Sequence, residues 1–247
     1  MGESYGKFAG VYDTLMRDVD YAGWTAYLMA LLEDHGGAHT VLDCACGTGE
    51  FAIRLAREGY SLTGLDASDD MLRIAQDKAR AQGLTIPFVC QDMRRLSLHR
   101  PVDALLCACD GVNYLTGMAD VRAFFKSAAA AIKPGGIFLF DISSHYKLER
   151  VLGGNTFGET EEDCAYLWRN RYDEKSRLCE MELTCFVKRG SLYGRFDERH
   201  VQRAHSVREV TGALEAAGFG EIAAYAAFTR EPPMPDTERI QFCAVRI

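Results

Sequence analysis

The stretch Val41-Leu-Asp-Cys-Ala-Cys-Gly-Thr-Gly-Glu-Phe51 indicates how this chain folds. A short apolar run ends in an acid, and two glycines follow it, Gly47 and Gly49. Glycine allows a sharp turn and a close approach of the backbone to a ligand. Apolar residues at helical spacing then begin at Phe51. A strand, a glycine turn and a helix in this order present backbone N–H groups to a ligand, so we expect a nucleoside cofactor at this turn.

The glycines alone leave two classes of cofactor open. Gly47, Gly49 and Ala52 satisfy the G-x-G-x-x-G/A fingerprint of a dinucleotide site, which makes an NAD-dependent oxidoreductase one candidate. Asp43 points to another class, because a carboxylate at the strand end that faces the turn suits a cationic ligand better than a pyrophosphate.

Four motifs in order carry a resemblance to a known family. Asp43-Cys-Ala-Cys-Gly-Thr-Gly49 resembles motif I of the class I S-adenosylmethionine-dependent methyltransferases, with Ala45 where many members have their first glycine. The similarity continues through 62–68, 88–93 and 133–141, and residues 5–16 are similar to the N-terminus of small-molecule members. It covers residues 1–142 and is looser from 143 onward.

The resemblance implies a Rossmann-like α/β fold with a seven-stranded sheet and helices on both faces. It also implies an enzyme that transfers a methyl group from S-adenosylmethionine to a nitrogen or oxygen nucleophile of a small molecule by in-line displacement. A non-catalytic cofactor-binding module is the remaining alternative, since such a module would bind the cofactor without turnover.

Cofactor contacts follow from the same motifs. Asp66 comes nineteen residues after Gly47, the separation at which an acid on the second strand reaches the ribose hydroxyls. Asp92 is expected at the adenine amino group, with a helix cap as its alternative. Tyr12 and Trp24 offer a hydroxyl and an indole N–H to the cofactor carboxylate, although aromatic residues in short helices often only pack. The full predicted set is Tyr12, Trp24, Asp43, Ala45, Gly47, Gly49, Asp66, Met71, Asp92, Met93 and Cys109. Met71 has core packing as its alternative, and Asp43 has capping of the turn.

Hydrophobic periodicity divides the chain into three parts. Residues 1–37 read as two helices, 3–17 and 21–35, that form an N-terminal lid. Through 38–142 apolar strands alternate with helices, the last of which is expected to end at 133–135. The predicted strands are 39–43, 61–66, 86–91, 102–107 and 136–141. This alternation is typical of a parallel sheet covered on both faces, and 206–247 completes the core with a helix and a closing strand pair. Residues 143–205 interrupt the alternation with extended segments 164–172, 178–188 and 191–203, which predict a small antiparallel β cap on the substrate side.

Methyl transfer from a sulfonium depends on alignment and desolvation more than on a catalytic triad or a metal. An amine must arrive neutral and a hydroxyl must lose its proton, so a base near the methyl group is useful. We predict that His200 is this base, because period-two alternation places it on one face with Phe196 and Glu198. The opposite face is made up of Tyr193, Arg195, Asp197 and Arg199.

The acceptor is expected to contact Asn113, His145, Tyr166 and Trp168. Asn113 lies in the loop 109–114 after the fourth strand, and His145 follows the fifth strand. Both that loop and His145 are also alternative sources of the base. Tyr166 and Trp168 alternate on an aromatic face of the cap, which either lines a substrate pocket or is its ordinary packing side.

The composition of the chain limits the classes of partner that it is expected to bind. A net charge of −7 gives no general attraction to a phosphate backbone, so nucleic acid is disfavoured as a substrate. The nine scattered cysteines read as reduced thiols of a cytoplasmic protein, and the Cys44/Cys46 and Cys107/Cys109 pairs as buried small hydrophobes, with no metal site expected. No apolar run approaches the ~18 residues of a membrane span.

Overall fold

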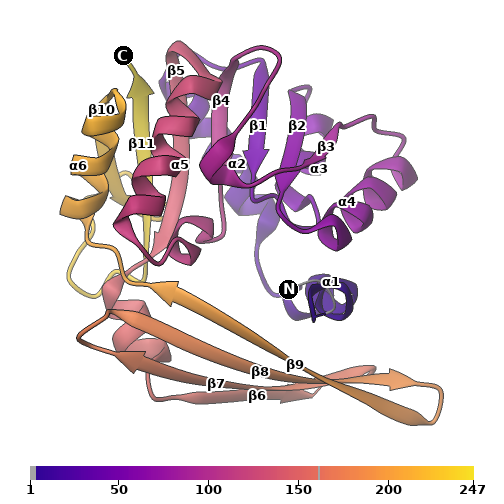
Figure 1. Cartoon of the computed structure of the whole chain (residues 1–247). Coiled ribbons are helices and arrows are strands. Elements are labelled where there is room, and N and C mark those ends of the chain that lie inside the picture. Colours follow the sequence, from indigo (N-terminus) through magenta and orange to yellow (C-terminus); the bar gives the residue numbers. More distant parts are fainter. Residues whose placement is uncertain (1–3, 161) are drawn as a thin grey trace.

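A computed structural model, which describes residues 4–160 and 162–247, shows two sheets joined by short segments (Figure 1). The larger sheet has seven strands in the order β10-β11-β5-β4-β1-β2-β3. Its strands are β1 (Thr40–Cys44), β2 (Ser61–Asp66), β3 (Phe88–Cys90), β4 (Val102–Cys107), β5 (Ile132–Ser143), β10 (Phe219–Ala226) and β11 (Arg239–Arg246). The pairs among β1 to β5 are parallel, whereas β11 runs antiparallel to both β5 and β10. The predicted seven-stranded fold is confirmed.

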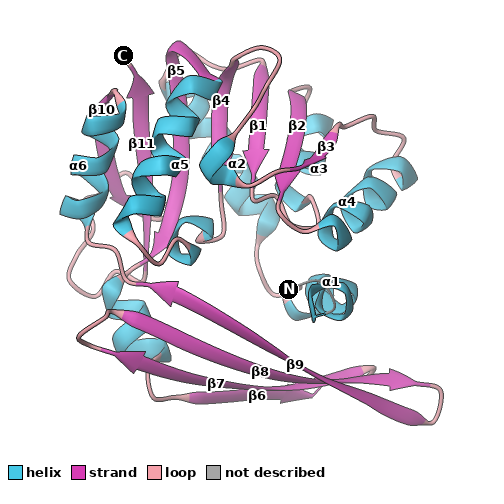
Figure 2. Cartoon of the chain, in the orientation of Figure 1, coloured by secondary structure: helices cyan, strands magenta, loops and turns pink. Residues whose placement is uncertain are grey.

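Helices cover both faces of this sheet (Figure 2). On one face α5 (Met118–Ala131) and α6 (Val207–Ala217) bury a core rich in phenylalanine, which includes Phe124, Phe138 and Phe242. On the other face α2 (Tyr21–Asp34) and α3 (Glu50–Arg57) pack through Leu28 and Leu55. Two apolar layers on one parallel sheet explain why its strands read as continuous apolar runs.

The remaining helices frame the end of the sheet where β1, β2 and β4 finish. Helix α4 (Asp69–Ala81) begins at Ser68, whose hydroxyl accepts a hydrogen bond from Met71 N. Helix α1 (Ser4–Leu15) lies against α4 and against the second sheet. The single turns η1 (Met93–Arg95) and η2 (Gly111–Tyr114) follow β3 and β4. Residues 1–3 of the predicted lid lie outside the described residues.

The second sheet is the insert. After the short helical segment η3 (Lys147–Leu152), four antiparallel strands follow in the order β6-β7-β8-β9. They are β6 (Thr156–Thr160), β7 (Cys164–Asp173), β8 (Leu178–Arg189) and β9 (Leu192–Arg203). In Figure 1 this sheet extends below the larger one and passes beneath α1.

Several elements differ from the sequence prediction. Strand β6 was not predicted, because its centre is Gly158-Glu159 and all five of its residues are exposed on a sheet edge. Strand β3 is shorter than the predicted 86–91. Residues 133–135 were expected only to end a helix, yet β5 already starts at Ile132, which pairs with Val102 before the register shifts. No helix among the described residues is long and apolar enough to cross a membrane.

Candidate active site

The turn after β1 contains three residues with positive φ: Ala45 (56°), Gly47 (53°) and Gly49 (80°). The two glycines are needed for different reasons. A Cβ on Gly49 would lie 3.0 Å from Ala75 Cβ, so this glycine allows α3 to pack closely against α4. A Cβ on Gly47 would meet nothing within 4 Å, so the backbone there borders open space that a ligand can occupy.

Two acids support this turn from neighbouring strands. Asp66 Oδ2 accepts from Gly47 N at 2.8 Å and Oδ1 accepts from Ser68 N at 2.9 Å, while the side chain stays half-exposed. Burial raises its pKa. Asp43 is 1% exposed and accepts from Ala52 N at 3.1 Å, and burial raises its pKa to about 7. Asp43 therefore anchors the start of α3, which is the capping alternative to its predicted place beside the cofactor.

Three residues predicted at the adenine end make contacts within the chain. Asp92 caps η1 through Arg94 N at 2.9 Å and pairs with the Arg94 guanidinium, which lowers the pKa of the carboxyl. Met93 packs partly against the core, and Met71 is buried with Phe8. The structure thus shows the alternative roles of Asp92 and Met71, a cap and a core residue, and their contacts with adenine stay predictions.

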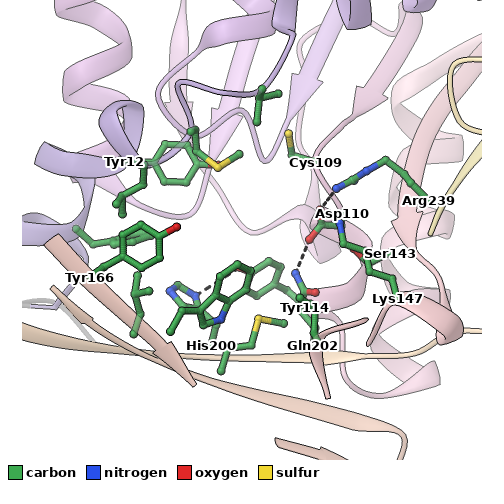
Figure 3. Close-up of a pocket in the computed structure, with 18 of the residues that line it drawn as sticks. Tyr12, Cys109, Asp110, Tyr114, Ser143, Lys147, Tyr166, His200, Gln202 and Arg239 are labelled. Atoms are coloured by element: carbon green, nitrogen blue, oxygen red, sulfur yellow. Dashed lines mark hydrogen bonds and ion pairs between the residues drawn. The ribbon is translucent and has the colours of Figure 1, made fainter. Parts of the chain in front are cut away.

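A cavity of about 350 Å³ opens between α1, the loop after β4 and the inner face of the inserted sheet (Figure 3). Six residues of the predicted site line it. They are Tyr12, Trp24, Cys109, Tyr166, Trp168 and His200. The cavity therefore brings together residues that are more than 180 positions apart in the sequence, and the aromatic face of the cap lines it.

His200 faces into this cavity. It pairs with Met181 of β8, its ring lies 5.2 Å from the Phe8 ring, and its Nδ1 lies 3.4 Å from the Tyr114 hydroxyl. Burial lowers its pKa, so the imidazole is neutral at pH 7. Arg195 and Arg199 of the opposite face are 61% and 62% exposed at their side chains. The His200 face is therefore the one that turns inward, a choice that the sequence left open, and the role of His200 as a base stays a prediction.

A polar cluster that the sequence analysis did not predict occupies one side of the cavity (Figure 3). Arg239 donates to Asp110 at 2.9 Å and pairs with buried Asp141, and its guanidinium lies 4.9 Å from the centre of the Trp24 ring. Gln202 also donates to Asp110. Burial alone would raise the pKa of Asp110, but the cations Arg239 and Lys147 hold it below its usual value. Asp110 is therefore ionised, and both of its carboxylate oxygens accept hydrogen bonds from side chains.

Signals for these residues were present in the sequence. An antiparallel strand begins at the edge where parallel strands end, and Arg239 is the first residue of β11, opposite Ser143 at the end of β5. Gln202 shares the face of His200 by period-two alternation. Lys147 is the first residue of η3, shortly after β5, and no periodicity in the sequence indicated that its side chain would line the cavity.

Two predicted substrate residues lie elsewhere. Asn113 is fully buried, and its side chain bonds the backbone of Ser143 and Arg203, so it ties β5 to β9 instead of lining the cavity. His145 points away from the cavity, with its side chain 54% exposed beside Glu149 and Tyr172. Neither Asn113 nor His145 lines the cavity, because loop position alone did not show where these side chains point, and their contacts with an acceptor stay predictions.

Helix α1 is fastened to the turn. Asp13 accepts from the Thr48 hydroxyl at 2.6 Å and from Lys78 Nζ at 2.8 Å, and Lys78 also pairs with Glu50. Nearer the N-terminus of the same helix, the ring of Phe8 packs against the imidazole of His200. Helix α1 thus connects the glycine turn to the inserted sheet.

The residues present fit a nucleoside cofactor. Trp24 Nε1 is buried and has no hydrogen-bond partner among the described residues, so it is a donor available to a ligand in the cavity it lines. The open backbone at Gly47 and the half-exposed Asp66 carboxylate lie at the ends of adjacent strands. Across 4–160 and 162–247, no group of three or more His, Cys, Asp or Glu side chains is placed to hold a metal ion.

Comparison with known proteins gives consistent matches. Residues 41–136 match a family model described as a methyltransferase domain. The chain is 40% identical to a putative methyltransferase, YqeM, of Bacillus subtilis, over 97% of this chain and 96% of that one. It resembles the crystal structure of an S-adenosylmethionine-dependent methyltransferase from Clostridium acetobutylicum, with 33% identity, a TM-score of 0.89 and 98% coverage of both chains. It also resembles CalS10, an amino pentose methyltransferase from Micromonospora echinaspora with the cofactor bound, at 25% identity, a TM-score of 0.77 and coverage of 96% and 97%.

Proposed function

Because the chain belongs to the S-adenosylmethionine-dependent methyltransferases, we propose that it methylates an amine of a small molecule held in the cavity between α1 and the inserted sheet. The family sets aside the NAD alternative and the non-catalytic one. One observation carries the amine assignment: the imidazole of His200 lies at the wall of the cavity, with its Nδ1 3.4 Å from the Tyr114 hydroxyl. A base of this kind is matched to an ammonium that must lose a proton more than to a hydroxyl.

S-Adenosylmethionine, when bound, supplies a methyl group already activated on a sulfonium. Its nucleoside end is assigned to the open backbone at Gly47 and to the carboxylate of Asp66. Its amino-acid end is assigned to the Trp24 indole N–H and the Tyr12 hydroxyl, both of which line the cavity. Positive charge next to aromatic faces is favourable, so the same two rings suit the sulfonium.

The inserted sheet supplies the acceptor side in this proposal. Trp168 and Leu183 form part of an apolar wall that excludes water from the reacting groups. His200 takes the proton that the amine must lose, and Tyr114, whose hydroxyl lies 3.4 Å from its Nδ1, fixes the orientation of the ring. The Phe8 ring at 5.2 Å keeps the imidazole in a dry setting, which maintains the neutral form.

The size of the cavity, about 350 Å³, suits a small acceptor. Nucleic acid is disfavoured in this proposal by the net charge of −7. Three arginines lie close together in the sequence after β3, Arg94, Arg95 and Arg100, and Arg94 is already paired with Asp92 and Asp120, so it has less charge to offer a phosphate. We also place the protein in the cytoplasm, since all nine cysteines are free thiols.

Two measurements on the purified protein test this function. Thermal unfolding with S-adenosylhomocysteine should show saturable stabilisation, and NAD should give none. Release of S-adenosylhomocysteine is then followed with S-adenosylmethionine and a panel of small primary amines, each matched to the alcohol of the same skeleton. We expect turnover with amines above the acceptor-free background. Turnover with the alcohols alone would refute the amine assignment.

A further inference from the structure

Lys147 is a cation of the cavity whose ammonium has no ion-pair partner in residues 4–160 and 162–247, as far as these are described. It comes four residues after Ser143 at the end of β5, and its backbone N donates to the Ser144 hydroxyl at 3.1 Å, which fixes the start of η3. The side chain is half-buried and lines the cavity. Within the described part of the chain, its ammonium takes part in no ion pair, and Asp110, Asp141 and Glu238 attract it only from farther away.

The nearby acids are already used by another cation. Arg239 binds Asp110 at 2.9 Å and pairs with Asp141, while Gln202 donates to the second oxygen of Asp110. Arg239 also repels Lys147, and together with burial it lowers the lysine pKa. A half-buried charge without a partner is unfavourable. The ammonium of Lys147 would therefore be stabilised by an anion from a bound molecule.

The charges of the loaded site also favour an anion. The two cations Arg239 and Lys147 are balanced by Asp110 and Asp141, and His200 is neutral. Bound S-adenosylmethionine would add a sulfonium, an ammonium and a carboxylate, and so one net positive charge. In a partly buried cavity an anionic acceptor offsets this charge, whereas a neutral acceptor leaves it in place.

On the premise of the proposed function, we infer that the acceptor is a small amine that carries a carboxylate, and that Lys147 binds this carboxylate while His200 faces the amine. Figure 3 shows Lys147 on the side of the cavity with Arg239, Ser143 and Gln202, and His200 with Tyr12 and Tyr166 toward the other side. The rest of the lining includes aromatic and aliphatic residues, among them Trp168 and Met181. An apolar skeleton that joins the amine to the carboxylate fits this arrangement.

The test uses protein saturated with S-adenosylhomocysteine and three probes of similar size: phenylacetate, phenylacetamide and phenyl phosphate. Calorimetric titration should show phenylacetate binding about tenfold more tightly than the neutral amide, the scale of one charge-assisted hydrogen bond. Lys147→Met should abolish this preference and leave the affinity for phenylacetamide unchanged. Lys126→Met, on the exposed face of α5, is the matched control and should keep the preference.

The remaining outcomes overturn the inference in distinct ways. Equal affinity of the wild-type protein for phenylacetate and phenylacetamide excludes an anion site, and this arm does not depend on the folding of any variant. Tighter binding of phenyl phosphate than of phenylacetate assigns the site to a phosphate ester. A loss of S-adenosylhomocysteine affinity in Lys147→Met assigns the lysine to the cofactor carboxylate. Failure of the wild-type protein to bind S-adenosylhomocysteine at all would instead contradict the proposed function.

Discussion

The glycine turn and the inserted sheet border the same end of the molecule but are constructed differently. At the turn, backbone groups are held by a neighbouring strand, as in the bond from Gly47 N to Asp66. In the insert, a regular ladder presents alternate side chains, so His200 and Gln202 face the cavity and Arg199 faces solvent. A change of ligand at the turn would require a change of backbone, whereas the acceptor side can vary by single side chains on an unchanged sheet.

The largest expected effect is a loss of turnover on substitution of His200, which distinguishes the inserted sheet from the glycine turn. We expect His200→Ala to lower turnover about 10²-fold or more, the lower range for loss of a general base, while the affinity for S-adenosylhomocysteine stays unchanged. Initial-rate kinetics and calorimetry measure the two quantities. His145→Ala is the matched control, because His145 lies outside the cavity.

The pH dependence sharpens the same prediction. Because the pKa of His200 is lowered, the neutral base is lost only as the pH falls below its ordinary value of about 6.5. In the wild-type protein kcat/KM should therefore rise with pH through a pKa below 6.5. The His200→Ala variant should lack this rise of kcat/KM with pH. If the His200→Ala protein keeps the same rise of kcat/KM with pH, or binds the cofactor poorly, His200 is not the base.

The second effect belongs to the turn. We expect Asp66→Ala to weaken S-adenosylhomocysteine binding by about 1.5–3 kcal/mol, the scale of charge-assisted hydrogen bonds, in a protein that remains folded. Asp66 also braces Gly47 and Ser68, so Asp66→Asn, which keeps one acceptor oxygen, should weaken binding less. Asp77→Ala, on the exposed face of α4, should leave the affinity unchanged. Unaltered affinity in a folded Asp66→Ala protein would contradict the ribose assignment.

The smallest effect concerns the junction between the inserted sheet and α6. His205 follows β9, is 1% exposed, and has a pKa lowered to about 4 by burial and by Arg203. A histidine that is harder to protonate in the folded state contributes its full stability above about pH 6.5 and loses it as the pH falls toward 4. Between pH 7.5 and 5.5 this amounts to about 1 kcal/mol of unfolding free energy.

Urea unfolding at both pH values isolates that contribution. The wild-type protein should lose about 1 kcal/mol more on acidification than His205→Gln does, and His99→Gln, at an exposed position, should behave as the wild type. An identical loss in all three proteins would show that protonation of His205 does not weaken the junction.

The two regions also differ in how far the sequence predicted them. Motif residues near the turn fixed the sheet, and Gly47 and Asp66 lie where they were expected. Alternation along β9 correctly grouped His200 with Phe196 and Glu198, because the period of a strand is a local property, but it did not show which face of the strand lines the cavity. Asn113 and His145 were misplaced and Lys147 was missed, because the direction of a loop side chain depends on packing between distant segments. Arg239 was missed for a related reason, since its partners Asp110 and Asp141 are about 100 or more residues away in the chain.

The fastening of α1 has a consequence for the order of events in a catalytic cycle. The helix is held to the turn by Asp13 through Thr48 and Lys78, and it rests on the acceptor side through Phe8. With the donor bound at the turn as proposed, a molecule in the cavity would add contacts to the helix that covers it. We expect compulsory ordered kinetics, with the donor first on and its demethylated product last off, and product-inhibition patterns of a random mechanism would contradict this. Product release would then require α1 to move, and because Asp13 of α1 pairs with Lys78, we expect the turnover rate to depend on ionic strength.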